Sequence, residues 1–312
     1  MDNASSSHVS VLLTESVAAL KLEPEDCAVD CTFGRGGHSR LLLDQLGPSG
    51  RLLAMDKDPQ AVASLEARAL VEEGRFEIRH GSFAGLSREV ESLGWTGKVA
   101  GVLMDLGVSS PQLDEAERGF SFMREGPLDM RMDSSSGETA AEWLSRISEA
   151  ELANVLWRWG EERFSRRIAA AVVAKRREKP LQTTRDLASL IESVVPSREI
   201  GKHPATRSFQ AIRIAVNREL EDLETALDQA IDVLKPGGRL AVISFHSLED
   251  RIVKRFIRDQ ERGWSHGQAP HPMAAPAVSR LKRIGKAVMP GPKEVAVNPR
   301  ARSAVLRIAE KV

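Results

Sequence analysis

The chain has 312 residues, with 44 lysines and arginines balancing 44 aspartates and glutamates, and only two cysteines. A length above the usual size of one domain, 42% hydrophobic residues and 28% charged residues exclude a disordered chain, a coiled coil and a collagen. The first ten residues are polar and no apolar run reaches membrane-spanning length, so we expect a cytoplasmic protein with no leader and no membrane segment.

The zero net charge averages over an uneven chain. Residues 1–105 carry a net charge of −6, residues 106–205 of −1 and residues 206–312 of +7. From Arg251 to the end, 14 basic residues stand against 4 acidic ones. A basic last third can bind phosphates while an acidic first third binds another ligand. A surface that is merely solvated explains the same counts equally well.

Strands and helices alternate in the first third of the chain. Apolar runs predict strands over residues 28–33, 51–56, 76–80 and 99–106. Helical patterns lie between them, over 39–46 and 59–73. This alternation indicates a parallel sheet with right-handed crossovers.

The alternation stops after Asp105, and no convincing strand occurs between about Asp114 and Lys202. Helices are predicted over residues 140–147, 149–159, 161–177 and 184–195. Thr184 is the expected N-cap of the last of these helices. We therefore expect a helical insertion between two strands of the sheet.

The last third returns to the sheet pattern. The predicted elements are a helix over 208–234, a strand over 239–245, a helix over 249–260 and two strands near 280–288 and 303–308. Residues 263–276 are rich in proline, glycine and alanine and predict a loop.

A glycine-rich turn, GRGGH over residues 34–38, follows the first predicted strand and opens a helix. Ser39 stands where the dinucleotide fingerprint has its third glycine, which argues against a pyrophosphate ligand. Asp56 ends the second strand, where a carboxylate can accept hydrogen bonds from both ribose hydroxyls. Together they indicate an adenosine ligand with a small charged tail, such as S-adenosylmethionine. A structural turn beside a surface aspartate is the alternative.

Asp105 ends the fourth predicted strand, at the edge where ligands of open α/β sheets bind. The polar loop after it, LGVSSPQL over residues 106–113, projects carbonyl and hydroxyl groups towards such a ligand. Methylating an exocyclic amine needs acceptors for its N–H groups, because the lone pair is delocalised into the ring. A cofactor contact or a turn cap explains Asp105 as well as catalysis does.

The chain resembles the RsmH (MraW) family of ribosomal RNA methyltransferases. The matching strings are DCTFGRGGH at 30–38, DKDP at 56–59, DLGVSSPQL at 105–113, RGFSF at 118–122, GPLDMRMD at 126–133, GEERF at 160–164, PATRSFQA at 204–211, SFHSLEDR at 244–251 and NPRARSA at 298–304. The resemblance implies an α/β fold, a class I (Rossmann-like) S-adenosylmethionine-dependent methyltransferase sheet with an inserted all-helical domain. Residues 1–112 and 206–312 would form the methyltransferase domain, and 113–205 the insertion, which would recognise the substrate.

The resemblance also implies a reaction and a cofactor site. The family transfers a methyl group from S-adenosylmethionine to N4 of cytosine 1402 in 16S rRNA, near the decoding site. The matching positions for the cofactor are Gly36, Gly37 and His38 at the methionine end, Asp56 at the ribose, Phe83 at the adenine, and Asp105 and Gln112 completing the pocket. The partner would be 16S rRNA, in the assembled small subunit or naked, and the oligomeric state, a homodimer included, stays open. Two cysteines and scattered histidines predict no metal site.

The proton acceptor is left open between Asp105 and His246, which follows the fifth strand. A structural hydrogen bond explains His246 as well as catalysis does. Phe120 and Phe122 could stack a flipped cytosine, although packing of the insertion against the sheet is the favoured interpretation. The expected RNA contacts are four arginines, Arg300 and Arg302 in a short basic loop and Arg163 and Arg167 in the insertion.

Three other functions fit part of the sequence. A DNA or protein amine methyltransferase often has Asn/Asp-Pro-Pro-aromatic after the fourth strand, whereas this chain has SSPQ over 109–112. An NAD-dependent oxidoreductase is disfavoured by Ser39. A non-catalytic ribosome-assembly factor that retains the pocket is the third.

Overall fold

The computed structural model describes residues 10–196, 203–264 and 278–312, so most of the loop expected over 263–276 lies outside the described residues. The chain forms two compact units. The first comprises Met1–Gly107 and Leu220–Val312, and the second comprises Val108–Glu219. None of the described helices is long and apolar enough to cross a membrane.

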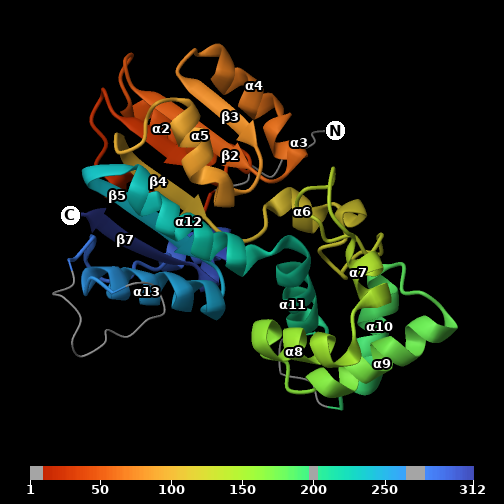
Figure 1. Ribbon diagram of the computed structural model, residues 1–312. Coiled ribbons are helices and arrows are strands. Elements are labelled where there is room, and N and C mark those ends of the chain that lie inside the picture. Colours follow the sequence, from red (N-terminus) through yellow and green to blue (C-terminus); the bar gives the residue numbers. More distant parts are fainter. Residues whose placement is uncertain (1–9, 197–202, 265–277) are drawn as a thin grey trace. The chain divides into compact units, whose positions relative to one another are not determined.

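The first unit is built on a seven-stranded sheet with the strand order β3-β2-β1-β4-β5-β7-β6 (Figure 1). The strands are β1 (Cys27–Asp30), β2 (Arg51–Asp56), β3 (Phe76–His80), β4 (Val99–Asp105), β5 (Leu234–Ser244), β6 (Leu281–Arg283) and β7 (Val305–Lys311). The first five strands pair in parallel, while β7 is antiparallel to both β5 and β6. The order reverses between β1 and β4, which is where open α/β sheets bind their ligands.

Helices cover both faces of this sheet. They are α1 (Leu13–Leu20), α2 (Gly37–Gln45), α3 (Pro59–Val62), α4 (Leu65–Glu72), α5 (Leu86–Ser92), α12 (Glu219–Val233), α13 (Ser247–Glu261) and α14 (Pro292–Val297). Alternate residues of a strand point to opposite faces. Met104 of β4 therefore packs with Leu227 of α12 and Phe256 of α13, while its neighbour Leu103 packs with Leu42 of α2 on the other face.

The second unit is helical. Its helices are α6 (Ser110–Asp114), α7 (Ala140–Arg146), α8 (Glu149–Gly160), α9 (Ser165–Glu178), α10 (Thr184–Val194) and α11 (Thr206–Asn217). Its described residues contain no strand, only an isolated bridge between Pro127 and Thr183. A separate apolar core holds the helices together, with Leu152, Ile168 and Phe209 among its buried side chains. The expected helical insertion between β4 and β5 is confirmed.

The boundaries of the two compact units differ from those expected at 112/113 and 205/206. The first unit ends at Gly107, and the second unit extends to Glu219. It thus includes α11, because Phe209 and Ile212 of that helix lie in its apolar core. The pattern of polar and apolar residues could not show this, since α11 and α12 are both amphipathic and adjoin in sequence.

Two predicted helices are broken and one cap was misplaced. The helix expected over 59–73 is interrupted at Ser64, whose Oγ accepts the N–H of Ala67 at 3.2 Å and caps α4. The helix expected over 208–234 is interrupted at Arg218, which adopts a left-handed φ of 54°. The N-cap of α10 is Thr183, not Thr184. In each case a local backbone conformation overrides a continuous apolar pattern.

Candidate active site

The glycine-rich turn joins β1 to α2 in the first unit. Gly34 and Gly36 have φ values of 56° and 75°, which L side chains rarely adopt. Gly36 is the N-cap of α2, so the turn leaves the first N–H groups of the helix facing out of its N-terminus. A Cβ on Gly37 would lie 2.2 Å from Oγ of Ser10. The backbone angles therefore favour glycine at Gly34 and Gly36, and a side chain at Gly37 would require Ser10 to move.

Asp56 ends β2 beside this turn. Its Oδ2 accepts the N–H of Gly34 at 2.7 Å, and its Oδ1 accepts the N–H of Asp58 at 2.8 Å. Burial raises the pKa of Asp56 to about 6. Each carboxylate oxygen retains a second lone pair, so the group can still accept two hydroxyl hydrogen bonds.

A buried acidic cluster lies at the ends of β1 and β4. Asp30 is fully buried and accepts hydrogen bonds from Oγ of Ser39 at 2.7 Å and from the N–H of Thr32 at 3.1 Å. Oγ1 of Thr32 in turn accepts the N–H of Asp105 at 2.7 Å, which ties the two strand ends together. Nδ1 of His38 lies 3.6 Å from Oδ2 of Asp105.

Asp105 is the most perturbed carboxyl group of this cluster. Burial raises its pKa well above the ordinary value, and the nearby charges of Asp30 and Glu249 raise it further. Its Oδ1 is buried and accepts no hydrogen bond from any residue in the described part of the chain. Such an oxygen is aimed at a ligand or is held protonated, because a buried acceptor left without a partner is costly.

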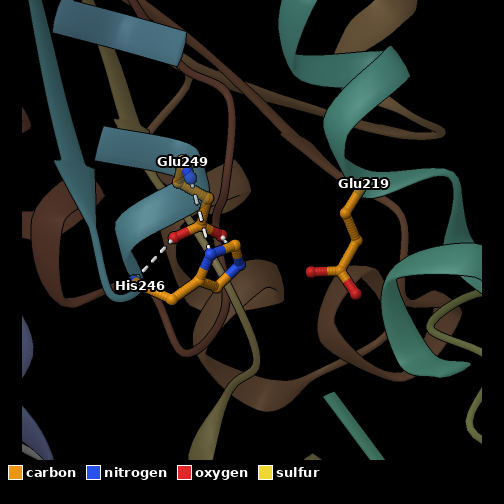
Figure 2. A group of neighbouring side chains, drawn as sticks. All are labelled: Glu219, His246 and Glu249. Atoms are coloured by element: carbon orange, nitrogen blue, oxygen red, sulfur yellow. Dashed lines mark hydrogen bonds and ion pairs between the residues drawn. The ribbon is translucent and has the colours of Figure 1, made fainter. Parts of the chain in front are cut away.

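His246 caps helix α13 (Figure 2). Its Nδ1 accepts the N–H of Glu249 at 3.4 Å, and Oε2 of Glu249 accepts the N–H groups of Phe245 at 2.8 Å and of His246 at 3.3 Å. Nε2 of His246 lies 3.1 Å from Oε1 of Glu249. Nδ1 is thus engaged by its own helix end, while Nε2 is buried and makes no hydrogen bond to any residue in the described part of the chain. Glu219, also labelled in Figure 2, belongs to the second unit, where it pairs with Arg213.

The other residues expected at the cofactor fall in both units. Phe83 begins a 3-10 turn (Phe83–Gly85) in the first unit and packs beside the apolar core there. Gln112 lies in the second unit, where its Oε1 accepts the N–H of Ser109 at 2.9 Å and caps α6. Six of the seven expected cofactor residues thus belong to the first unit.

The two phenylalanines considered for base stacking pack within the second unit. Phe120 is buried, with the guanidinium carbon of Arg118 5.8 Å from its ring centre. The ring of Phe122 lies 4.9 Å from that of Phe209 and 4.5 Å from that of His203. The partners of both rings lie inside the insertion, so these contacts do not bear out the expected packing of the insertion against the sheet.

The expected RNA-binding arginines are all exposed. Arg300 and Arg302 lie in the 3-10 segment Pro299–Ser303 of the first unit, and Arg163 and Arg167 lie in the second unit. Arg176, in contrast, is structural, because it donates to the carbonyls of Leu144 and Ile147 at the end of α7.

Asp30 and Glu249 are not among the functional residues predicted from the sequence. A signal for Asp30 was present, since three neighbouring strands, β1, β2 and β4, each end in aspartate. Glu249 gave no such signal, because an acidic residue in the first turn of a helix is explained by the helix dipole alone.

Comparisons with known proteins place this geometry in a family. The family model described as the MraW methylase family matches residues 5–312. The chain belongs to this family. It is 57% identical over 300 residues to "Ribosomal RNA small subunit methyltransferase H" of Methylococcus capsulatus, covering 96% of this chain and 99% of that protein. It is 56% identical over 306 residues to the protein of the same name from Chromohalobacter salexigens, covering 98% and 92%. A solved rRNA methylase from Streptococcus thermophilus aligns over 98% of this chain and 99% of that one, with a TM-score of 0.43 and 13% identity.

Proposed function

We propose that the chain methylates N4 of cytosine 1402 in 16S rRNA, with S-adenosylmethionine as the methyl donor. The observation that carries this proposal is the 57% identity over 96% of the chain to a relative named as the ribosomal RNA small subunit methyltransferase. The chain is an S-adenosylmethionine-dependent ribosomal RNA methyltransferase. The small-subunit rRNA is its substrate, and a ribosomal substrate supports a place in the cytoplasm.

The residues of the first unit fit the cofactor. When bound, S-adenosylmethionine supplies a methyl group on a positively charged sulfonium. The carboxyl groups of Asp30 and Asp105 lie at this end of the sheet, and a bound sulfonium would favour their charged forms, which burial alone disfavours. Gly36 and Gly37 would let the methionine end approach the backbone, and Asp56 would accept the ribose hydroxyls. His38 and Phe83 would complete the pocket in this unit, and a cofactor contact of Gln112 stays a prediction from the family resemblance.

Asp105 is our candidate for the group that receives the amine proton. N4 forms its bond to the methyl carbon while the bond from sulfur to carbon breaks, and N4 then loses one proton to an acceptor. Oδ1 of Asp105 is buried without a hydrogen-bond partner among the described residues, and burial raises the pKa of this carboxyl group, which makes its carboxylate a stronger base. His246 is the weaker candidate, because Nδ1 accepts a backbone N–H and Nε2, although it makes no hydrogen bond among the described residues, lies 3.1 Å from the carboxylate of Glu249.

Further contacts to RNA would come from the exposed arginines of both units, Arg163, Arg167, Arg300 and Arg302. The assembled subunit is the proposed form of the substrate, and a homodimer is a proposal that a measured mass in solution would test. Phosphate contacts of this kind position the RNA without reading its sequence.

The deciding experiment is transfer of a tritiated methyl group to small-subunit particles from a strain that lacks the modification. We expect N4-methylcytidine in the nuclease digest, at the position of cytosine 1402. The same assay on naked 16S rRNA distinguishes the two forms of the substrate. If neither form of the substrate yields N4-methylcytidine in the digest, the proposal is wrong.

A further inference from the structure

A basic cleft lies in the first unit, on the side of the sheet where α13 packs against β7. Its volume is about 220 Å³. One wall is a face of α13, with Lys254, Ile257, Arg258 and Glu261 at helical spacing. The other wall is formed by residues 283–287, and Arg307 and Ile308 of β7 complete the lining. None of the functional residues considered above lines this cleft.

The cleft exists because the edge of β7 is interrupted. The N–H of Ile284 donates to the carbonyl of Ile308, and the chain pairs with β7 again only at Val288, which exchanges hydrogen bonds with Leu306. The three residues between form a turn at Gly285, whose φ is 65°. This turn holds Lys286 at the rim, close to the side of α13.

The lining carries five cationic side chains and one carboxylate. Two of the cations are already neutralised, since Arg307 makes two hydrogen bonds to Asp250, at 2.6 and 3.0 Å, and Arg258 pairs with Asp259. The side chains of Lys254, Arg283 and Lys286 have no ion pair or hydrogen bond to any residue in the ranges that the structure describes. All three are exposed. Three unneutralised cations around one cleft create a positive potential that attracts anions.

The shape and chemistry of the cleft indicate which anion it takes. Its volume is below the roughly 300–1,000 Å³ of pockets that enclose whole small-molecule ligands. No described lining residue is aromatic, so a base would find nothing to stack on. The anion that fits the cleft is therefore a phosphate with part of its attached sugar. The apolar side chains of Ile257, Ile284 and Ile308 can contact the sugar.

We propose that this cleft binds the sugar–phosphate backbone of the substrate RNA. The inference rests on the proposed function, which supplies the RNA, and it adds a contact away from the reacting base. The cleft lies within the segment from Arg251 to the end of the sequence, which carries a net charge of +10. A phosphate contact of this type raises affinity without sequence preference and makes binding sensitive to salt.

The test compares two triple variants with the same change in charge. The cleft variant is Lys254→Ala with Arg283→Ala and Lys286→Ala. The control variant is Arg255→Ala with Lys282→Ala and Lys293→Ala, which removes three exposed cations of the same unit that do not line the cleft. Binding to a 16S rRNA fragment that contains the target cytosine, and to a scrambled RNA of equal length, is measured at several salt concentrations.

For the cleft variant we expect the affinity for both RNAs to fall by roughly tenfold or more. The slope of log affinity against log salt concentration should become smaller in magnitude by about 2. The affinity for S-adenosylmethionine and the single-turnover rate at saturating RNA should stay unchanged. An equal loss in both variants, or none in the cleft variant, would overturn the proposal. Failure of the wild-type enzyme to methylate any RNA would instead count against the proposed function, so the two failures are distinguishable.

Discussion

The proposed ribose contact of Asp56 predicts that cofactor binding depends on pH. Burial raises the pKa of Asp56 from 3.8 to about 6, so the charged carboxylate, which would accept the two ribose hydroxyls, prevails only above about pH 6. We expect the affinity for S-adenosylhomocysteine, which has the ribose but no sulfonium charge, to fall by up to about tenfold per pH unit below pH 6. Calorimetry from pH 5 to 8 measures this.

The matched control is Asp56→Asn, which keeps the shape of the side chain. It should bind S-adenosylhomocysteine more weakly and with little dependence on pH, because the titrating group is gone. A wild-type affinity that stays constant between pH 5 and 7 would contradict the ribose role of Asp56.

Asp105 and His246 can be separated as proton acceptors by two conservative variants. Asp105→Asn removes the base and should lower kcat about 10²-fold or more. His246→Asn should retain most of kcat, because asparagine can still cap α13 by accepting the N–H of Glu249. Single-turnover methylation of the small subunit measures both rates. A loss in His246→Asn as large as that in Asp105→Asn would remove our assignment.

Residue-scale expectations succeeded where a residue's place at the end of a strand sets its role. Asp56 and Asp105 end β2 and β4 as expected, because the strand and its terminal acid are both visible in sequence. The sequence did not distinguish a capping role of His246 from a catalytic one. The cap depends on the side chain of Glu249, which folds back onto the end of the strand and is not visible in the sequence. The roles in cofactor binding stay predictions until ligands are measured.

At the scale of elements, the contact between the glycine turn and the start of the chain is testable. Gly37→Ala places a Cβ 2.2 Å from Oγ of Ser10, in a helix where alanine is otherwise favourable. We expect the free energy of unfolding to fall by about 1–3 kcal/mol. Adding Ser10→Ala removes the closest atom and should recover part of this loss. Urea denaturation measures all three proteins.

Gly291→Ala is the control for this series, because a Cβ there meets nothing within 4 Å and needs no unusual backbone angle. It should change the free energy of unfolding by little. If Gly37→Ala is as stable as Gly291→Ala, the close approach of Ser10 does not constrain the turn.

Elements defined by apolar pattern were predictable, and their breaks were not. The strands β2 and β3 match the predicted ranges, because alternating apolar runs are bounded by acids, glycines and prolines. The breaks at Ser64 and Arg218 depend on a hydroxyl cap and on one left-handed residue, each set by only a few atoms. Neither leaves a mark in the spacing of apolar residues.

At the scale of the whole molecule, the uneven charge along the chain matches the two proposed binding functions, for the cofactor and for RNA. The acidic first third contributes β1 to β4, whose ends carry Asp30, Asp56 and Asp105, and it would bind a cationic cofactor. The basic segment after Arg251 contributes α13 and β7 with the cleft between them, and it would bind a polyanion. Both segments lie in the same compact unit, so one sheet would carry both the cofactor site and the RNA-binding cleft.

The second unit is expected to fold by itself. Its residues, 108–219, are continuous in sequence, and the apolar core around Leu152, Ile168 and Phe209 draws its buried members from that range alone. Helices α7, α8 and α10 each begin with a capping box, so their ends are satisfied locally. We therefore expect the isolated segment to be helical by circular dichroism and to unfold cooperatively in urea.

The isolated segment also has an internal control. Leu152→Ala removes a fully buried side chain of that core and should destabilise the segment by about 2–5 kcal/mol. Trp157→Ala, at a residue with 59% of its surface exposed, should cost far less. A segment that lacks a cooperative transition would mean that residues 108–219 need the sheet in order to fold. A segment with equal losses in both variants would mean that its core is not packed as described.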